Sequence, residues 1–182
     1  DNGWRIGATT TWTDIIRADL PPSFNALKSA AREVGSIQIQ NAGTIAGNLC
    51  NASPAADGTP CLLALDATVE LVSAAGSRTM ALSDFITGPS QTALRSNEIM
   101  TAIHVSHDSG RGRSYFSKLG ARKYLVISIA MVAARVAVND GAIAQVAISV
   151  GACSAVAVRL AEAEATLIGQ PVHTDTLSTI SD

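Results

Sequence analysis

Two apolar runs joined by a tight turn place the strongest constraint on the fold of this chain. The runs cover 127–138 and 143–150, and Asn139-Asp140-Gly141 lies between them. Asn and Asp tolerate a positive φ and Gly accepts it without strain, so this tripeptide favours the reversal of a β-hairpin. The periodic segment 159–168 then predicts a helix that buries Leu160, Ala163 and Leu167. The C-terminal part of the chain is therefore expected to be a small α+β unit with an antiparallel hairpin and a helix.

The rest of the chain predicts short strands that alternate with short helices. The strands are expected at 4–8, 69–72, 78–81 and 98–105, and the helices at 11–18, 24–34 and 61–65. Thr11 begins the first helix in the manner of a capping box, and Thr59-Pro60 is a good N-cap and N1 pair for the third. A polar, glycine-containing linker at 106–113 marks a boundary. We therefore predict an α+β fold with two domains, 1–108 and 109–182.

Composition narrows the class of protein. Of the 182 residues, 47% are hydrophobic and 15% are charged, which is typical of a folded chain rather than a disordered one. The net charge of −2 gives no basic surface for nucleic acid. No apolar run reaches the roughly 18 residues that a membrane span needs. We therefore expect a cytoplasmic protein that neither binds nucleic acid nor spans a membrane.

The metal-ligating and nucleophilic residue types do not form a recognisable site. Cys50, Cys61 and Cys153 are odd in number and lack C-x-x-C spacing. They predict free thiols rather than a disulfide framework, a zinc site or an iron–sulfur cluster. The three histidines are accompanied by neither a G-x-S-x-G nor an H-E-x-x-H motif. We predict no catalytic side chain and no metal site on this chain.

One segment, 41–57, has the composition of a ligand-binding turn, because it combines glycine, alanine and short polar residues with very few large side chains. Glycine lets the main chain approach a ligand, and consecutive N–H groups in a tight turn bind an anion. Thr44 and Asn48 add donors, and Asp57 offers an acceptor for a sugar hydroxyl. The segment therefore suits a dinucleotide, although it has neither Rossmann nor Walker spacing. The alternative is a loop of ordinary turn formers.

The same segment carries a family resemblance. Residues 44–48, Thr-Ile-Ala-Gly-Asn, and 52–57, Ala-Ser-Pro-Ala-Ala-Asp, resemble the second flavin-binding motif of the FAD subunit of molybdenum hydroxylases. This family includes bacterial xanthine dehydrogenase and the medium chain of carbon monoxide dehydrogenase. Further similar stretches follow in the family order at 62–67, 83–85, 97–100 and 115–122. The resemblance therefore spans nearly the whole chain.

The chain departs from the family pattern in two respects. Ala46 stands where the family usually has the first glycine of a pair, which strains the backbone only if φ is positive there. The family's first FAD motif would precede Arg5-Ile6-Gly7-Ala8, and this sequence begins at Asp1. The sequence is either a piece of a longer chain or a homologue that has lost half of its cofactor cradle. Because it does not start with methionine, we expect a piece of a longer chain, with the N-terminal lobe of the first domain missing.

The resemblance implies which residues bind the cofactor. These residues are Val34, Thr44, Ile45, Ala46, Gly47, Asn48, Ser53, Asp57, Ile99, Met100 and Lys118. Lys118 would lie near the pyrimidine edge of the flavin, where a cation stabilises the reduced, anionic form and raises the reduction potential. Asp57 and Ser53 could instead serve a helix cap and a Ser-Pro turn. Ile99 and Met100 could be core residues, and Lys118 could be a basic side chain exposed to solvent.

The resemblance also implies a function and partners. The chain would be an FAD-binding electron-transfer subunit, with molybdopterin on a large partner subunit and [2Fe–2S] centres on a small one. Electrons would pass from these centres to FAD and then to an external acceptor such as NAD⁺ or oxygen, within a dimer of heterotrimers. The smaller C-terminal domain would close over the flavin. The alternative is a structural or assembly subunit of the same fold that binds no flavin.

Overall fold

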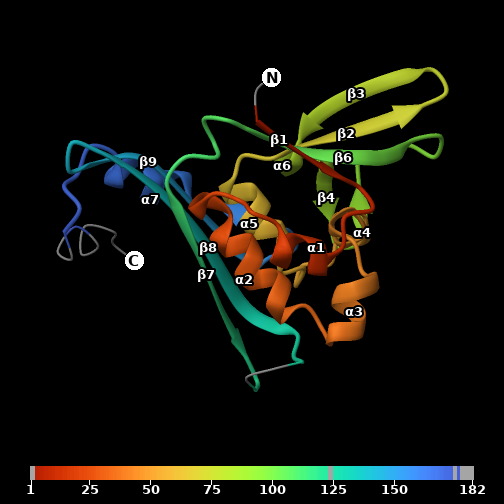
Figure 1. Cartoon of the computed structure of the whole chain (residues 1–182), viewed down its shortest axis with the longest axis horizontal. Helices are drawn as coiled ribbons and strands as arrows, with labels where there is room; N and C mark the ends of the chain where they lie inside the picture. Colours follow the sequence, from red (N-terminus) through yellow and green to blue (C-terminus); the bar gives the residue numbers. More distant parts are fainter. Residues whose placement is uncertain (1–2, 123–124, 174–175, 177–182) are drawn as a thin grey trace.

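The computed structural model describes residues 3–122, 125–173 and 176, which form two four-stranded antiparallel sheets with helices between them (Figure 1). The first sheet has the order β1 (Gly3–Gly7), β6 (Ile99–Ser106), β2 (Thr68–Ser73) and β3 (Gly76–Ala81). The second has the order β10 (Val158–Arg159), β9 (Ala142–Gly151), β8 (Ser128–Asn139) and β7 (Arg113–Gly120). A short ribbon pairs β4 (Ile86–Gly88) with β5 (Gln91–Thr92). This architecture confirms the predicted α+β class.

The helices are all short. They are α1 (Trp12–Arg17), the 3₁₀ turn η1 (Pro22–Phe24), α2 (Asn25–Glu33), α3 (Ile37–Ala42), α4 (Ile45–Asn51), α5 (Gly58–Ala64), α6 (Leu82–Phe85) and α7 (Ala161–Leu167). Helix α2 packs on β7, and α5 packs on β8 and β9, so the inner face of the second sheet rests on these two helices (Figure 1). Helix α7 packs against β9 from the other side of the sheet. Helices α2 and α5 therefore connect the first part of the chain to the C-terminal sheet.

The main hydrophobic core lies between the helices and the inner faces of the two sheets. Its largest fully buried side chains include Trp12, Phe24, Leu27, Phe85 and Ile103. A separate small cluster under α7 consists of Ile143, Val146 and Leu167. Within the described residues, no helix has the length and apolar character needed to cross a membrane.

The elements that local sequence signals predicted are present. Strands β8 and β9 form the expected hairpin, with Asp140 at φ 49° and Gly141 at φ 79° in the turn. Thr11 caps α1 in a complete capping box with Asp14. Helix α2 buries Leu27 and Ala31, as its spacing predicted. Each of these predictions depends on residues close together in the sequence.

Three predictions are wrong in detail. The segment after Gly35 contains two helices, α3 and α4, where the sequence predicted only a ligand-binding turn. Helix α5 begins at Gly58, because Asp57 already has helical backbone angles, and not after Thr59-Pro60. Leu160, expected to be buried by α7, is 38% exposed, since it precedes the helix instead of lying on its inner face.

Candidate functional site

The predicted anion-binding turn is the first turn of α4. The Oγ1 of Thr44, the N-cap residue, accepts a hydrogen bond of 3.0 Å from the N–H of Gly47. A Cβ on Gly47 would lie 2.9 Å from that oxygen, so glycine allows the cap to form. Ala46 lies inside α4, where the backbone is right-handed, and alanine therefore causes no strain there. The departure from the family glycine is compatible with the helix.

Helices α4 and α5 approach each other closely beside two unsatisfied polar atoms. Within the described part of the chain, the buried Oδ1 of Asn48 and Oγ1 of Thr59 have no hydrogen-bond partner. A Cβ on Gly58 would lie 3.0 Å from Asn48 Oδ1 and 2.6 Å from the ring of Trp12, so only glycine fits between the helices. An unpaired buried polar atom costs about 1–3 kcal/mol. Such an atom is therefore available to a ligand that reaches it.

The remaining predicted contact residues lie around these helices in different environments. Ser53 Oγ accepts from the Ala55 N–H at 3.3 Å, so it serves a local turn. Val34 ends α2 and packs against the main core. In β6, which packs against α4, Ile99 is 65% exposed whereas Met100 is buried. The role of each toward a cofactor stays a prediction.

The structure brings Asp57 and Lys118 together, although 61 positions separate them in the sequence. Lys118 Nζ donates to Asp57 Oδ2 at 2.8 Å, and the two side chains are 7% and 9% exposed. Ser128 Oγ donates to the other carboxylate oxygen, Oδ1, at 2.6 Å. The two simpler alternatives are therefore wrong, because Asp57 makes no side-chain cap of α5 and Lys118 is not a solvated base. Sequence reasoning missed Ser128, which begins an apolar run and gave no signal of its own.

Lys118 also borders a surface hollow. This hollow, with a volume of about 430 Å³, lies between α2 and the end of β7 and is lined by Ser29, Glu33, Phe116, Lys118 and Arg122, among others. An ammonium group carries three N–H donors. Within the described residues, Asp57 and the more distant carbonyl of Val126, at 3.4 Å, take two of them. One donor of a buried cation is thus left for a molecule that enters from the hollow.

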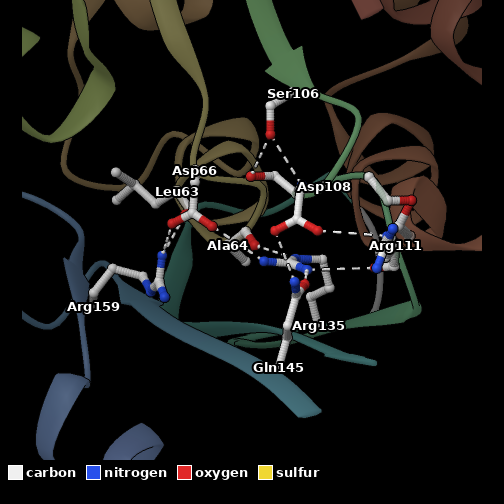
Figure 2. A network of polar contacts seen from close by, with 12 residues as sticks. Leu63, Ala64, Asp66, Ser106, Asp108, Arg111, Arg135, Gln145 and Arg159 are labelled. Carbon is white, nitrogen blue, oxygen red and sulfur yellow. Dashed lines mark hydrogen bonds and ion pairs between the residues drawn. The ribbon is translucent and has the colours of Figure 1, made fainter. Parts of the chain in front are cut away.

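A second charged cluster lies at the opposite end of α5 (Figure 2). Arg135, from β8, donates to the carbonyl of Ala64 at 2.8 Å, and Arg159, from β10, donates to the carbonyl of Leu63 at 2.9 Å. Both guanidinium groups also form ion pairs with Asp66. Burial lowers the pKa of Arg135. Cations stabilise the C-terminal end of a helix, so Arg135 and Arg159 complement the helix dipole of α5 there, whereas at the N-terminal end the favourable negative charge is that of Asp57, the N-cap residue of α5 itself.

Arg159 is further held by Glu164 of α7, at 2.6 Å from Nε. Burial raises the pKa of the Glu164 carboxyl, but hydrogen bonds from Arg159 and from the N–H of Ile148 outweigh it, and the net direction is down. Gln145 also accepts from Arg135 at 2.9 Å, and among the described residues each of the two guanidinium groups makes four hydrogen bonds with its five N–H donors. The C-terminal end of α5 is therefore a structural junction.

Two family models cover most of the chain. Residues 1–107 match the FAD binding domain in molybdopterin dehydrogenase, and residues 115–182 match the CO dehydrogenase flavoprotein C-terminal domain. The chain is 38% identical over 182 residues to the nicotinate dehydrogenase FAD-subunit of Eubacterium barkeri, covering 97% of this chain and 62% of that one. It is 33% identical over 181 residues to the glyceraldehyde dehydrogenase medium chain of Sulfolobus acidocaldarius, covering 99% and 64%.

The fold is shared with a solved structure. The reconstituted CO dehydrogenase from Oligotropha carboxidovorans superimposes with a TM-score of 0.89 at 27% identity, over 98% of this chain and 62% of that one. The chain thus spans less than two thirds of the length of the relatives that it matches. These similarities confirm the resemblance first found in residues 44–57. This chain therefore belongs to the family defined by the FAD binding domain in molybdopterin dehydrogenase, and its C-terminal part belongs to the CO dehydrogenase flavoprotein C-terminal domain family.

Proposed function

We propose that this chain is the FAD-binding electron-transfer part of a molybdopterin-dependent hydroxylase complex. It would take electrons from [2Fe–2S] centres and deliver them to an external acceptor such as NAD⁺ or oxygen. The observation that carries this proposal is the buried Lys118–Asp57 pair, which the C-terminal sheet places at the end of the flavin motif and beside a hollow. The proposal includes the predicted domains 1–108 and 109–182, which the two family matches support.

The residues present fit an FAD molecule. Thr44, Ile45, Ala46 and Gly47 form the first turn of α4, where backbone N–H groups would face the pyrophosphate. Asn48 follows in the same helix and has an unpaired carboxamide oxygen. We expect Val34 and Ser53 to lie along the cofactor, and Ile99 and Met100 to pass beside the flavin ring. A carboxylate accepts about four hydrogen bonds, so Asp57 keeps capacity for a ribose hydroxyl.

The protein's contribution at the flavin end is electrostatic. When bound, FAD would supply the redox chemistry, because a flavin can accept electrons one at a time and release them singly or in pairs. Lys118 would hold a positive charge near the pyrimidine edge, where it stabilises negative charge in a site sheltered from water. Asp57 would keep that charge in place. No side chain is required as a nucleophile or general base.

The proposed partners follow from the relatives. Their names describe an FAD-subunit and a medium chain, which are parts of larger assemblies. We place molybdopterin on a large partner subunit and the [2Fe–2S] centres on a small one, in a dimer of heterotrimers. The free thiols of Cys50, Cys61 and Cys153 support a cytoplasmic location. The substrate of the complex would be chosen on the molybdopterin subunit.

The flavin content of the full-length chain tests this proposal. We expect purified protein to show visible flavin bands, and the cofactor released by denaturation to run as FAD on chromatography, at one molecule per chain. Asp57→Asn and Lys118→Met should each lower the amount bound. A colourless protein that also fails to bind added FAD would contradict the proposal. The flavin-free structural subunit would then be the better interpretation.

A further inference from the structure

We infer that Ser128 is a positioning residue for the cofactor site, and that it acts through the carboxylate of Asp57 on the ammonium group of Lys118. The inference rests on the proposed function, because it gives Ser128 a part in a flavin site. Ser128 itself touches neither Lys118 nor the hollow in the described contacts. Its role is carried by one hydrogen bond and by an irregularity of the strand that makes this bond possible.

That irregularity is a β-bulge at the beginning of β8. Leu119 pairs with Ala130 and Gly120 pairs with Ser128, so the residue between them, Ile129, has no partner on β7. Met131 and Ala133 face the core, and strict alternation would therefore bury Ile129 and expose Ser128. The bulge reverses this outcome, since Ile129 is 56% exposed and Ser128 only 6%.

This arrangement works against the hydrophobic effect. Burying an isoleucine side chain is favourable, whereas burying a hydroxyl is unfavourable unless it finds a hydrogen-bond partner. Bulges are found next to functional sites, where they turn a side chain toward a required position. The required position here is the carboxylate of Asp57, which Ser128 reaches at 2.6 Å. The strand thus gives up apolar burial in order to place one hydroxyl on one carboxylate oxygen.

The hydroxyl determines how the carboxylate is oriented. With Oδ1 engaged by Ser128, Oδ2 accepts from Lys118 at 2.8 Å, in a linear chain of two hydrogen bonds. Without the hydroxyl, Oδ1 becomes a buried acceptor with no donor, and the carboxylate can rotate to place both oxygens on the ammonium group. Such a rotation draws Lys118 toward Asp57 and away from the hollow. Ser128 therefore sets the position of the positive charge that a bound flavin would experience.

Conservative variants of Ser128 in the full-length chain separate this role from simple packing. Ser128→Ala removes the hydroxyl, Ser128→Cys replaces it with a weak donor of similar size, and Ser128→Thr retains it. Ser149→Ala is the matched control, because Ser149 is equally buried, lies on the neighbouring strand β9, and donates to the carbonyl of Val158 instead. The probe is FAD, and the readouts are its dissociation constant and the reduction potential of the bound flavin.

We expect Ser128→Ala and Ser128→Cys to bind FAD about tenfold more weakly, and to show a lower flavin potential because the cation has moved away. Ser128→Thr and Ser149→Ala should match the wild type in both readouts. Equal FAD affinity and potential in Ser128→Ala and in the wild type would overturn the inference alone. A wild-type chain that binds no FAD would overturn the proposed function.

A second readout needs no flavin. In the FAD-free chain, the shift in urea midpoint caused by Ser128→Ala is compared with the shift that it causes in a Lys118→Met background. Because the two side chains communicate through Asp57, we expect the two shifts to differ. Additive shifts would show that Ser128 and Lys118 act independently, and would overturn the inference whatever the cofactor.

Discussion

The two ends of α5 use similar contacts for different purposes. At each end, side chains from the C-terminal sheet place a buried cation beside an aspartate of the first domain. At the C-terminal end, two guanidinium groups are surrounded by carbonyl, carboxylate and amide oxygens, as Figure 2 shows. At the N-terminal end, one ammonium group has fewer acceptors and borders a hollow.

This difference indicates which end is structural and which is functional. Arg135 and Arg159 each make four hydrogen bonds to protein acceptors among the described residues, and these bonds join β8 and β10 to the end of α5. Lys118 makes two hydrogen bonds among the described residues and lines a hollow, so its ammonium group has a donor left for a ligand. We therefore interpret the Arg135 end of α5 as structural and the Asp57 end as the cofactor site.

The largest effect on stability is expected from Arg135→Met. The change removes the donor to the Ala64 carbonyl and to Gln145, and leaves buried acceptors without partners. We expect a loss of about 4 kcal/mol in the free energy of unfolding, measured by urea denaturation. The FAD affinity of the molecules that remain folded should not change. Arg111→Met is the control, because its exposed ion pair with Asp108 should contribute less than about 0.5 kcal/mol. A smaller loss for Arg135→Met than for Arg111→Met would contradict the structural role.

Lys118→Met should lower both the stability and the FAD affinity. It leaves the carboxylate of Asp57 buried without its counter-charge, and we expect a loss of about 3 kcal/mol. Adding Asp57→Asn removes the uncompensated charge and should restore most of the stability. The double variant should still bind FAD weakly, because no cation faces the hollow. If the restored stability came with restored FAD binding, Lys118 would have no role beyond the ion pair.

Gly58→Ala tests the close packing of α5 against α1, which carries Trp12, and against α4. The added methyl group would lie 2.6 Å from the ring of Trp12, which is itself buried, so the helices must move apart. We expect a loss of about 2 kcal/mol together with weaker FAD binding, since Asp57 moves with the helix. Gly7→Ala is the matched control, because its nearest contact would be Thr10 Oγ1 at 3.8 Å. Equal melting temperatures for the two variants would show that the contact is not tight.

The sequence predicted those parts of the fold and the site that depend on neighbouring residues or on an extended motif. The Asn139-Asp140-Gly141 turn predicts the β8–β9 hairpin because its backbone angles are a local property. The order of motifs from residue 44 to residue 122 identified the family, and with it Asp57 and Lys118. It gave no indication that these two residues bind each other, because pairing across 61 positions is a property of the fold.

Ser128 and Arg135 show why the rest of the site could not be predicted. Both lie in or beside an apolar run, and period-two alternation is the only rule that sequence offers for such a run. The bulge at Ile129 breaks that rule and exchanges the two faces of the strand. A charged residue within an apolar strand was the available signal for Arg135, since a buried arginine requires acceptors. Helix α3 was missed because Ile37 and Ile39 are two positions apart, which is not a helical spacing, and α4 because most of its side chains are small.

The smallest effect is expected from Glu70→Gln, which changes a carboxylate remote from α5. The variant tests how much this carboxylate contributes to the loss of stability at acidic pH. Glu70, on the first sheet, accepts from Arg5, Thr101 and His104, and these hydrogen bonds, with that of Arg5 the largest, lower its pKa to about 2. A carboxyl group with a lowered pKa contributes stability above its unfolded value of 4.5, and this contribution is lost as the pH falls toward 2. Glu70→Gln should therefore destabilise the protein at pH 7 and flatten the decline in urea midpoint between pH 4.5 and pH 2. FAD affinity at pH 7 should be unaffected, because Glu70 lies on neither end of α5. An unchanged acid profile in Glu70→Gln would show that the hydrogen bonds to Glu70 do not contribute to the acid sensitivity.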